Sequence, residues 1–223
     1  MKYTTLLFDL DDTLLDFGKA EDNAIVLLMK KYGIEPSEEN KQLYSDLNRA
    51  KWTALEKGEI TRKELFSTRF ADFFRSLGID ADSTKANEEY ISSLGQGHFL
   101  LDGALETCRI LSQKYSMFII TNGAKKAQEG RLGNSPLMKY FDGVFISEEI
   151  GFDKPKKEYF DYVYSHIPEK DKSKTLVIGD SLNSDIAGAV GYGIDSCWVN
   201  RGEDKASPAT YTVKKVADLL LIL

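Results

Sequence analysis

Short apolar runs alternate with helix-like segments through the C-terminal half of the chain. The runs lie at 116–121, 143–146, 175–178 and 196–199, and a further run at 4–8 stands near the N-terminus. Helices are predicted between them at about 125–133, after Pro155 and at about 184–191. Strands that are apolar throughout and separated by helices are buried on both faces. This favours a parallel sheet with right-handed crossovers and helices on both sides. The pattern therefore predicts an α/β fold in which the N-terminal strand joins the same sheet.

Residues 17–97 are charge-rich and lack strong strand signals. Apolar residues recur there at helical spacing, for example at Ile25 and Leu28. Pro36 with Ser37 indicates a helix start, and helix stops are indicated at Gly33, Gly58 and Gly78. An all-helical insertion of this length indicates a separate small domain, with residues 1–16 and 98–223 forming the core domain. A helical extension of the core itself is the alternative.

The charge of the chain limits the partners that it can bind. Its 223 residues carry a formal net charge of −6, with 42% hydrophobic and 29% charged residues. That balance is ordinary for a soluble globular protein, and it argues against a nucleic acid polymer, which is held by a basic face. A small phosphorylated metabolite stays possible, since a metal ion and a few local cations can outweigh the mean field.

Two cysteines, Cys108 and Cys197, lie far apart in the sequence and form no CxxC pair. We expect buried free thiols, as in a reducing compartment, rather than a disulfide framework. The N-terminus shows no export signal, and no apolar run approaches the roughly 18 residues of a membrane span. The sequence thus predicts a cytoplasmic protein without a membrane partner, acting as a monomer or a homodimer.

The run at 4–8 ends abruptly in the segment DLDDT at 9–13. Three carboxylates cannot share a buried loop unless a partner neutralises them, because unpaired buried charge is very costly. The simplest neutraliser is a divalent cation, and a ligand set made only of oxygen atoms favours Mg²⁺. A carboxylate left over beside that metal could attack phosphorus, so the segment indicates phosphoryl transfer. A purely local role in the turn is the alternative for Asp12 and Thr13, and we favour it for Thr13.

Three further polar clusters stand at or after the ends of later predicted strands. They are Thr121 with Asn122, Lys154, and Asp180 with Asp185. In open parallel sheets, ligands bind outside the carboxyl ends of the strands, so the clusters are expected to converge on one point. Their chemistry is complementary, since carboxylates suit a metal, while a hydroxyl, an amide and an ammonium suit phosphate oxygens.

The order of these motifs resembles the haloacid dehalogenase (HAD) superfamily of phosphotransferases. DxDxT, a Thr, a Lys and GDxxxxD follow one another at the superfamily's spacing, and the helical insertion resembles its C1-type cap. The TNG sequence and the stretches at 151–160 and 179–186 look like the YjjG/YfnB-type pyrimidine 5′-nucleotidase branch. The resemblance implies a Rossmann-like, HAD-like core with an inserted all-α helical-bundle cap.

The resemblance also implies roles for the carboxylates. Asp9 would be the nucleophile that forms an aspartyl-phosphate, and Asp11 would protonate the leaving alkoxide and then activate water. Mg²⁺ would be held by Asp9, the backbone carbonyl of Asp11, and Asp180. Asp185 would bind the metal through water or orient its shell, with a simple helix-terminal charge as the alternative.

The remaining motif residues are implied to bind the phosphoryl group. Thr121, with Asn122 beside it, would donate hydrogen bonds to phosphoryl oxygens. Lys154 would supply a positive charge to the same group and to Asp9. Together with the metal, that ammonium would stabilise the charge-rich transition state.

The sequence thus predicts a Mg²⁺-dependent phosphomonoester hydrolase, and the resemblance implies nucleoside monophosphates as its substrates. A sugar-phosphate phosphatase or phosphomutase would share Asp9 and Asp11 and differ chiefly in the cap. A 2-haloacid dehalogenase needs no general acid at Asp11 and binds no Mg²⁺. A non-catalytic binding module is disfavoured, because Asp9, Asp11, Lys154 and Asp180 are all present.

Overall fold

The computed structural model describes residues 2–202 and 204–223. Its contacts divide the chain into two compact units. One, the core unit, comprises the residues up to Phe17 together with His98–Leu223, and the other, the helical unit, comprises Gly18–Gly97. No helix in the described part of the chain is both long and apolar enough to cross a bilayer.

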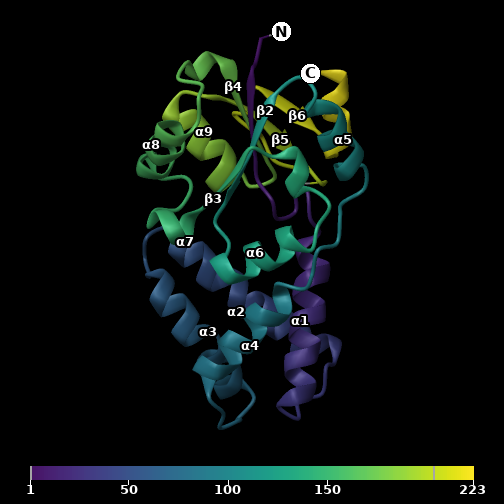
Figure 1. Ribbon diagram of the computed structural model, residues 1–223. Coiled ribbons are helices and arrows are strands. Elements are labelled where there is room, and N and C mark those ends of the chain that lie inside the picture. The colour runs from purple at the N-terminus through teal and green to yellow at the C-terminus, as the bar shows by residue number, and fades with distance from the viewer. Residues whose placement is uncertain (1, 203) are drawn as a thin grey trace. The chain divides into compact units, whose positions relative to one another are not determined.

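The strands described in the core unit form one parallel sheet in the order β3-β2-β1-β4-β5-β6 (Figure 1). Their bounds are β1 Thr5–Phe8, β2 Ser116–Thr121, β3 Gly143–Ile146, β4 Thr175–Gly179, β5 Asp195–Val199 and β6 Tyr211–Val213. The predicted parallel α/β fold is therefore confirmed, and all five predicted strands are present. The sixth, β6, was not predicted from the sequence.

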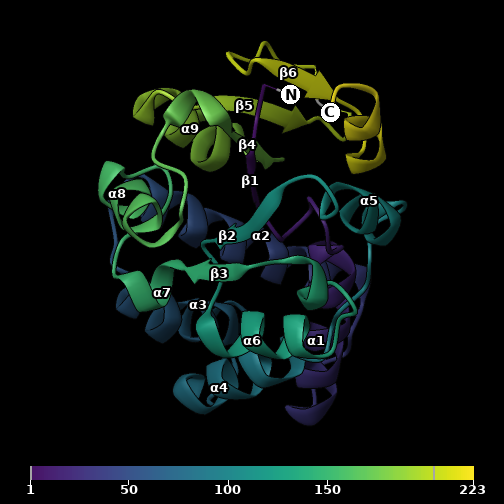
Figure 2. The same ribbon diagram turned by 45° about the horizontal axis from the view of Figure 1, so that its top comes forward.

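Helices pack on both faces of this sheet, as the apolar strands require. In chain order they are α5 Ala104–Leu111, α6 Lys125–Gly133, η1 Met138–Tyr140, α7 Ser147–Ile150, α8 Lys157–His166, η2 Lys172–Lys174, η3 Leu182–Ile186, α9 Ala187–Tyr192 and η4 Val216–Leu221. Figure 2 shows α8 and α9 on one side of the sheet and α5 on the other. Successive residues of a strand alternate between two hydrophobic cores: Leu6 and Phe8 pack with α5, and Leu7 packs with α8.

The strand order reverses direction at β1, and this places the functional loops. The chain passes from β1 to β2 and β3 on one side, then crosses to β4 and β5 on the other. Such a topological switch point opens a crevice at the carboxyl ends of the strands around it. The loops that follow β1, β2 and β4 carry polar motifs, and the loop between α7 and α8, which comes after β3, carries Lys154.

Both cysteines of the core unit are free and fully buried, as predicted. Cys108 lies on α5 and Cys197 on β5, in the same hydrophobic core. Burial raises the pKa of each thiol to about 12. The two side chains therefore act as core packing rather than as nucleophiles.

The helical unit contains α1 Phe17–Lys31, α2 Glu38–Glu56, α3 Arg62–Ser76 and α4 Ser83–Leu94. Its helix ends carry the signals that the sequence displays. Ser37 caps α2 as expected, and Thr61 forms a capping box with Glu64 at the start of α3. Gly33, Gly58 and Gly78, the predicted stops, have positive φ beyond the ends of α1, α2 and α3.

Aromatic rings fill the interior of the helical unit. Tyr44 of α2 contacts Phe70 and Phe73 of α3 and Tyr90 of α4 with ring centroids 5.2–5.5 Å apart. All four side chains are buried. The three contacts are stacked, edge-on and tilted, respectively. Aromatic pairs in offset-stacked or edge-on contact contribute about 0.5–1.5 kcal/mol per pair beyond their burial. This core is built for stability.

Candidate active site

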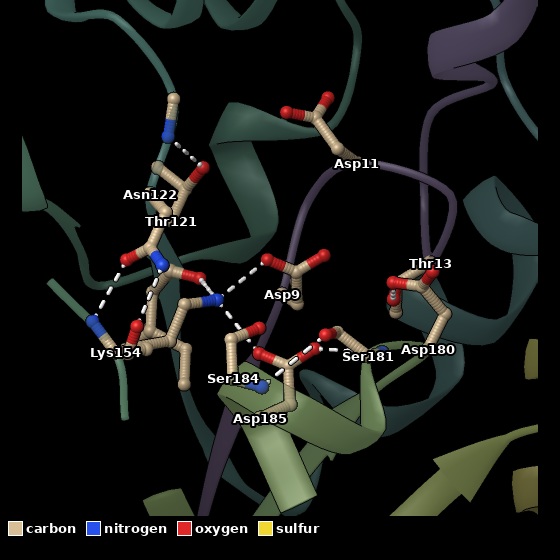
Figure 3. Close-up of polar contacts among 12 residues, drawn as sticks. Asp9, Asp11, Thr13, Thr121, Asn122, Lys154, Asp180, Ser181, Ser184 and Asp185 are labelled. Carbon is tan, nitrogen blue, oxygen red and sulfur yellow. Dashed lines mark hydrogen bonds and ion pairs between the residues drawn. The ribbon is translucent and has the colours of Figure 1, made fainter. Parts of the chain in front are cut away.

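Three carboxylates come together at the carboxyl ends of β1 and β4. Asp9, Asp180 and Asp185 each place one carboxylate oxygen within 4.8 Å of those of the other two (Figure 3). Asp9 directly follows β1, Asp180 directly follows β4, and Asp185 lies on the π-helical turn η3. The sequence predicted an ordinary helix from about residue 184, whereas the structure has this wider turn ahead of α9.

These carboxylates repel one another in a poorly hydrated place. Asp9 is 6% exposed and Asp185 is fully buried. Burial raises the pKa of Asp9 well above its usual range, because the attraction of Lys154 offsets it only in part and Asp185 adds repulsion. Burial, followed by the charges of Asp9 and Asp185, likewise raises the pKa of Asp180. The three carboxylates carry more negative charge than the one neighbouring lysine, Lys154, can balance.

Lys154 brings the only ammonium that the described hydrogen bonds place on this cluster. Its Nζ donates to Asp9 Oδ1 at 2.7 Å, to Asp185 Oδ1 at 2.7 Å and to the Ile120 carbonyl at 2.9 Å. Burial would lower the pKa of Lys154, but Asp185 and Asp9 outweigh it and raise that pKa well above its usual range. Lys154 is thus a fixed cation whose three donors are all engaged.

Asn122 holds the backbone that carries this lysine. Its amide Nδ2 donates to the Lys154 carbonyl at 2.9 Å, and its Oδ1 accepts from the Lys154 N–H at 2.9 Å. These two hydrogen bonds join the loop after β2 to the loop between α7 and α8 (Figure 3). The contacts give the Asn122 side chain a positioning task, and its predicted contact with phosphate stays a prediction.

Thr121, at the end of β2, is buried, and its hydroxyl oxygen accepts two hydrogen bonds. Its Oγ1 accepts from the Gly123 N–H at 3.2 Å and from Gln128 Nε2 at 2.8 Å. A hydroxyl has two lone pairs and one proton, so these contacts leave the proton for an incoming oxygen. That is the donor that a phosphoryl group would use.

The loop after β4 holds its own carboxylates in place. The Ser181 N–H donates to Asp185 Oδ2 at 3.1 Å, and the Thr13 hydroxyl donates to Asp180 Oδ1 at 3.3 Å. Thr13 is fully buried and therefore does more than shape the turn after β1. Gly179 makes the close approach possible, because a Cβ there would lie 2.2 Å from Asp185 Oδ2.

Asp11 is the predicted site residue whose carboxylate lies outside this cluster. Figure 3 shows that carboxylate pointing away from Asp9. Gln128 Nε2 donates to Asp11 Oδ2 at 2.8 Å, and Arg131 Nη1 forms a very short ion pair with Oδ1. Neither Gln128 nor Arg131 was singled out from the sequence. The available signal was two polar side chains one helical turn apart in the predicted helix 125–133.

Comparison with known proteins identifies the family. Residues 3–193 match the family model of the haloacid dehalogenase-like hydrolases. The chain belongs to this family. The expected membership is confirmed, and the HAD-like chain is a hydrolase.

Relatives at moderate identity cover the whole of this HAD-like chain. It is 40% identical to the putative HAD-hydrolase YfnB of Bacillus subtilis over 100% of the chain and 96% of that protein. It is 39% identical to the pyrimidine 5′-nucleotidase PynA of Streptococcus pneumoniae, covering 99% and 94% of the two chains. The pyrimidine 5′-nucleotidase YjjG of Escherichia coli is 31% identical, with 100% and 99% covered.

Solved structures share the architecture. A crystal structure of B. subtilis YfnB bound to magnesium superimposes with a TM-score of 0.94, covering 100% of this chain and 99% of that one at 40% identity. A 2-haloacid dehalogenase from Pseudomonas syringae reaches a TM-score of 0.66 at 24% identity, covering 99% and 97% of the two chains. The second likeness concerns the fold alone.

Proposed function

We propose that this HAD-like hydrolase is a Mg²⁺-dependent phosphatase that hydrolyses pyrimidine nucleoside 5′-monophosphates. The observation that carries the reaction is the surplus of negative charge, with three clustered carboxylates facing one lysine. The substrate class rests on PynA and YjjG, the relatives that are pyrimidine 5′-nucleotidases.

The residues present fit a magnesium ion. The cluster offers only carboxylate oxygens, which Mg²⁺ prefers. The raised pKa values of Asp9 and Asp180 indicate that the protein supplies too little positive charge to balance the carboxylates. Asp9 and Asp180 would hold the ion together with the Asp11 carbonyl. Asp185, engaged by Lys154 and the Ser181 N–H, would act on its shell. When bound, the metal would neutralise charge that develops on the phosphoryl oxygens.

The reaction would proceed in two displacements at phosphorus. In the first, an oxygen of Asp9 forms a bond to phosphorus while the ester P–O bond breaks, and Asp11 gives its proton to the departing nucleoside oxygen. In the second, Asp11 takes a proton from water as that water attacks the aspartyl-phosphate. Inorganic phosphate leaves, and both carboxyl groups return to their starting state.

Lys154 and Thr121 would stabilise the phosphoryl group during both steps, Lys154 by its positive charge and Thr121 by a hydrogen bond. The ammonium of Lys154 is fixed beside the Asp9 oxygen that it contacts, so it cancels charge without reorganising. The Thr121 hydroxyl keeps its proton for a phosphoryl oxygen. The helical unit, inserted between β1 and β2, would act as a cap that opens and closes over small substrates.

The expected setting follows from the same features. Free buried thiols favour a reducing compartment such as the cytoplasm, and the acidic chain favours small metabolites over nucleic acid polymers. A monomer or homodimer is proposed as the working state.

A kinetic panel tests the proposal. Phosphate release is measured from pyrimidine and purine nucleoside monophosphates and from sugar phosphates, with Mg²⁺ and with excess EDTA. We expect metal-dependent release that is fastest from the pyrimidine compounds. Release from sugar phosphates alone would overturn the substrate class, and no metal-dependent release from any phosphomonoester would overturn the reaction.

A further inference from the structure

Helix α6 directs two buried polar side chains at one carboxylate. Gln128 is 1% exposed and Arg131 is fully buried, although both are long polar residues. Gln128 donates to one oxygen of Asp11 and Arg131 to the other. Arg131 Nη1 also donates to the side-chain oxygen Oε1 of Gln128 at 3.3 Å, so the two side chains brace each other.

Gln128 also connects Asp11 to the loop that follows β2. The same Nε2 that reaches Asp11 donates to Thr121 Oγ1 at 2.8 Å. Gly123 leaves the space for this arrangement, because a Cβ there would lie 2.2 Å from Gln128 Nε2. The place of the Asp11 carboxylate is therefore fixed relative to the hydroxyl proposed to hold the phosphoryl group.

Burying an arginine is not needed for the packing of a helix such as α6. Removing a guanidinium from water is unfavourable, and its pairing with a carboxylate often does no more than offset that penalty. Two donors on the two oxygens of one carboxylate, however, restrict both the rotamer and the rotation of that group. The pair of side chains is suited to orientation rather than to stability.

We propose that Gln128 and Arg131 are positioning residues that align the carboxyl group of Asp11 for proton transfer to the leaving oxygen. The inference rests on the proposed function, in which Asp11 is the general acid and base. In this role both side chains act through Asp11. A misaligned acid weakens only the step that needs a proton delivered.

Two substrates with different leaving groups can distinguish this positioning role from a merely structural one. A nucleoside alkoxide must be protonated as the P–O bond breaks, whereas 4-nitrophenolate leaves without a proton. The value of kcat/KM reports the first displacement for both substrates. A positioning defect must therefore lower kcat/KM for uridine 5′-monophosphate and largely spare kcat/KM for 4-nitrophenyl phosphate.

The test compares Arg131→Met and Gln128→Met with the parent enzyme on both substrates. Because general acid catalysis contributes about 10²–10⁴-fold, we expect a loss of about 10–100-fold on the nucleotide and less than about 3-fold on the aryl ester. Arg131→Lys should recover part of the loss. Arg109→Met, which removes an exposed pair with Glu106 on α5, should change neither value.

A double-mutant cycle with Asp11→Asn completes the test. In the Asp11→Asn background the acid is already absent, so Arg131→Met should cause no further loss on the nucleotide. Equal losses on both substrates, or additive losses in the cycle, would overturn the inference. Gln128→Met, which removes only a neutral amide, decides the matter if Arg131→Met does not fold. If the parent enzyme hydrolyses neither ester, the proposed function itself fails.

Discussion

Each unit of the molecule buries a polar cluster, and the two clusters differ in whether their charges balance. In the core unit, Asp9, Asp180 and Asp185 face the single ammonium of Lys154. In the helical unit, the buried Arg69 lies among neutral amides and aromatic rings, with the carboxylate of Glu21 nearby.

The cluster of the helical unit satisfies itself. Arg69 Nε donates to Asn87 Oδ1 at 2.8 Å and Nη1 to Asn48 Oδ1 at 3.3 Å, and Arg69 Cζ lies 4.7 Å from the Tyr90 ring centroid. Asn48 Nδ2 in turn donates to Glu21 Oε1 at 2.7 Å. One cation and one carboxylate share a network of neutral partners, so no further ligand is required.

The difference distinguishes a structural cluster from a chemical one. A balanced network fixes how α2, α3 and α4 pack, because each partner is lost if the helices shift. A surplus of carboxylates is unfavourable until a cation arrives, which is why we assign the metal and the reaction to the core unit. Burial of charged groups alone therefore does not distinguish a structural cluster from a catalytic one. The net charge of the cluster does.

The largest expected effect is on catalysis. Asp9→Asn should lower kcat by at least about 10⁴-fold, because the nucleophile is lost and no other carboxylate takes its place. The thermal midpoint should not fall, since one member of a repelling group is removed. Steady-state assays and thermal unfolding check this, with Asp46→Asn, at an exposed position of α2, as the control. Activity within tenfold of the parent enzyme would show that Asp9 is not the nucleophile.

Removal of the lysine should upset the unbalanced cluster in a way that magnesium repairs. Lys154→Met leaves Asp9 and Asp185 facing each other, which we expect to lower the free energy of unfolding by about 3–5 kcal/mol without metal. Saturating Mg²⁺ should recover part of that loss, as read from thermal midpoints. Lys157→Met, which breaks an exposed pair with Asp161, is the matched control and should cost under about 1 kcal/mol. A loss that Mg²⁺ leaves untouched would contradict the charge argument.

A single methyl group should weaken the metal site. Gly179→Ala places a Cβ against the Asp185 carboxylate, so we expect Mg²⁺ affinity to fall by about 10–100-fold in a calorimetric titration. Gly133→Ala, whose Cβ would meet nothing within 4 Å, should bind Mg²⁺ like the parent chain. Unchanged affinity in Gly179→Ala would mean that Asp185 has no part in the metal site.

The balanced cluster should respond to mutation but not to metal. Arg69→Met should lower the free energy of unfolding by about 2–4 kcal/mol, because the Asn48 and Asn87 oxygens and Glu21 lose their cation. The decrease should be the same with and without Mg²⁺ in thermal unfolding experiments. Arg75→Met, at an exposed pair with Asp72, should cost under about 1 kcal/mol. Rescue of Arg69→Met by Mg²⁺ would erase the distinction between the clusters.

Much of the fold follows from patterns that the sequence displays locally. The apolar runs predict β1 to β5, and Ser37 with the glycine stops predicts where helices of the inserted segment begin and end. Strand β6 escapes prediction, because it is short and only Val213 in it is buried. Its pairing with β5 is a tertiary contact with no periodic signal.

The candidate site likewise contains residues that the sequence predicts and residues that it does not. Residues at strand ends are predictable, since parallel strands end at one edge of the sheet, and Asp9, Lys154, Asp180 and Asp185 do meet there. The clamp between Asn122 and the Lys154 backbone spans 32 residues and follows from no local pattern. Gln128 and Arg131 could not be assigned to Asp11, because the helical pattern does not say which loop a buried polar side chain reaches.

The central claim is that the carboxylate of Asp9 carries the phosphoryl group, and locating that group by mass spectrometry tests it most directly. The enzyme is mixed with uridine 5′-monophosphate and Mg²⁺, quenched in acid and treated with borohydride, which reduces an aspartyl-phosphate to homoserine. We predict that Asp9 alone is converted, only when substrate is present, and never in Asp9→Asn. Rapid turnover with Asp9 unmodified, or conversion of a different carboxylate, would contradict the account.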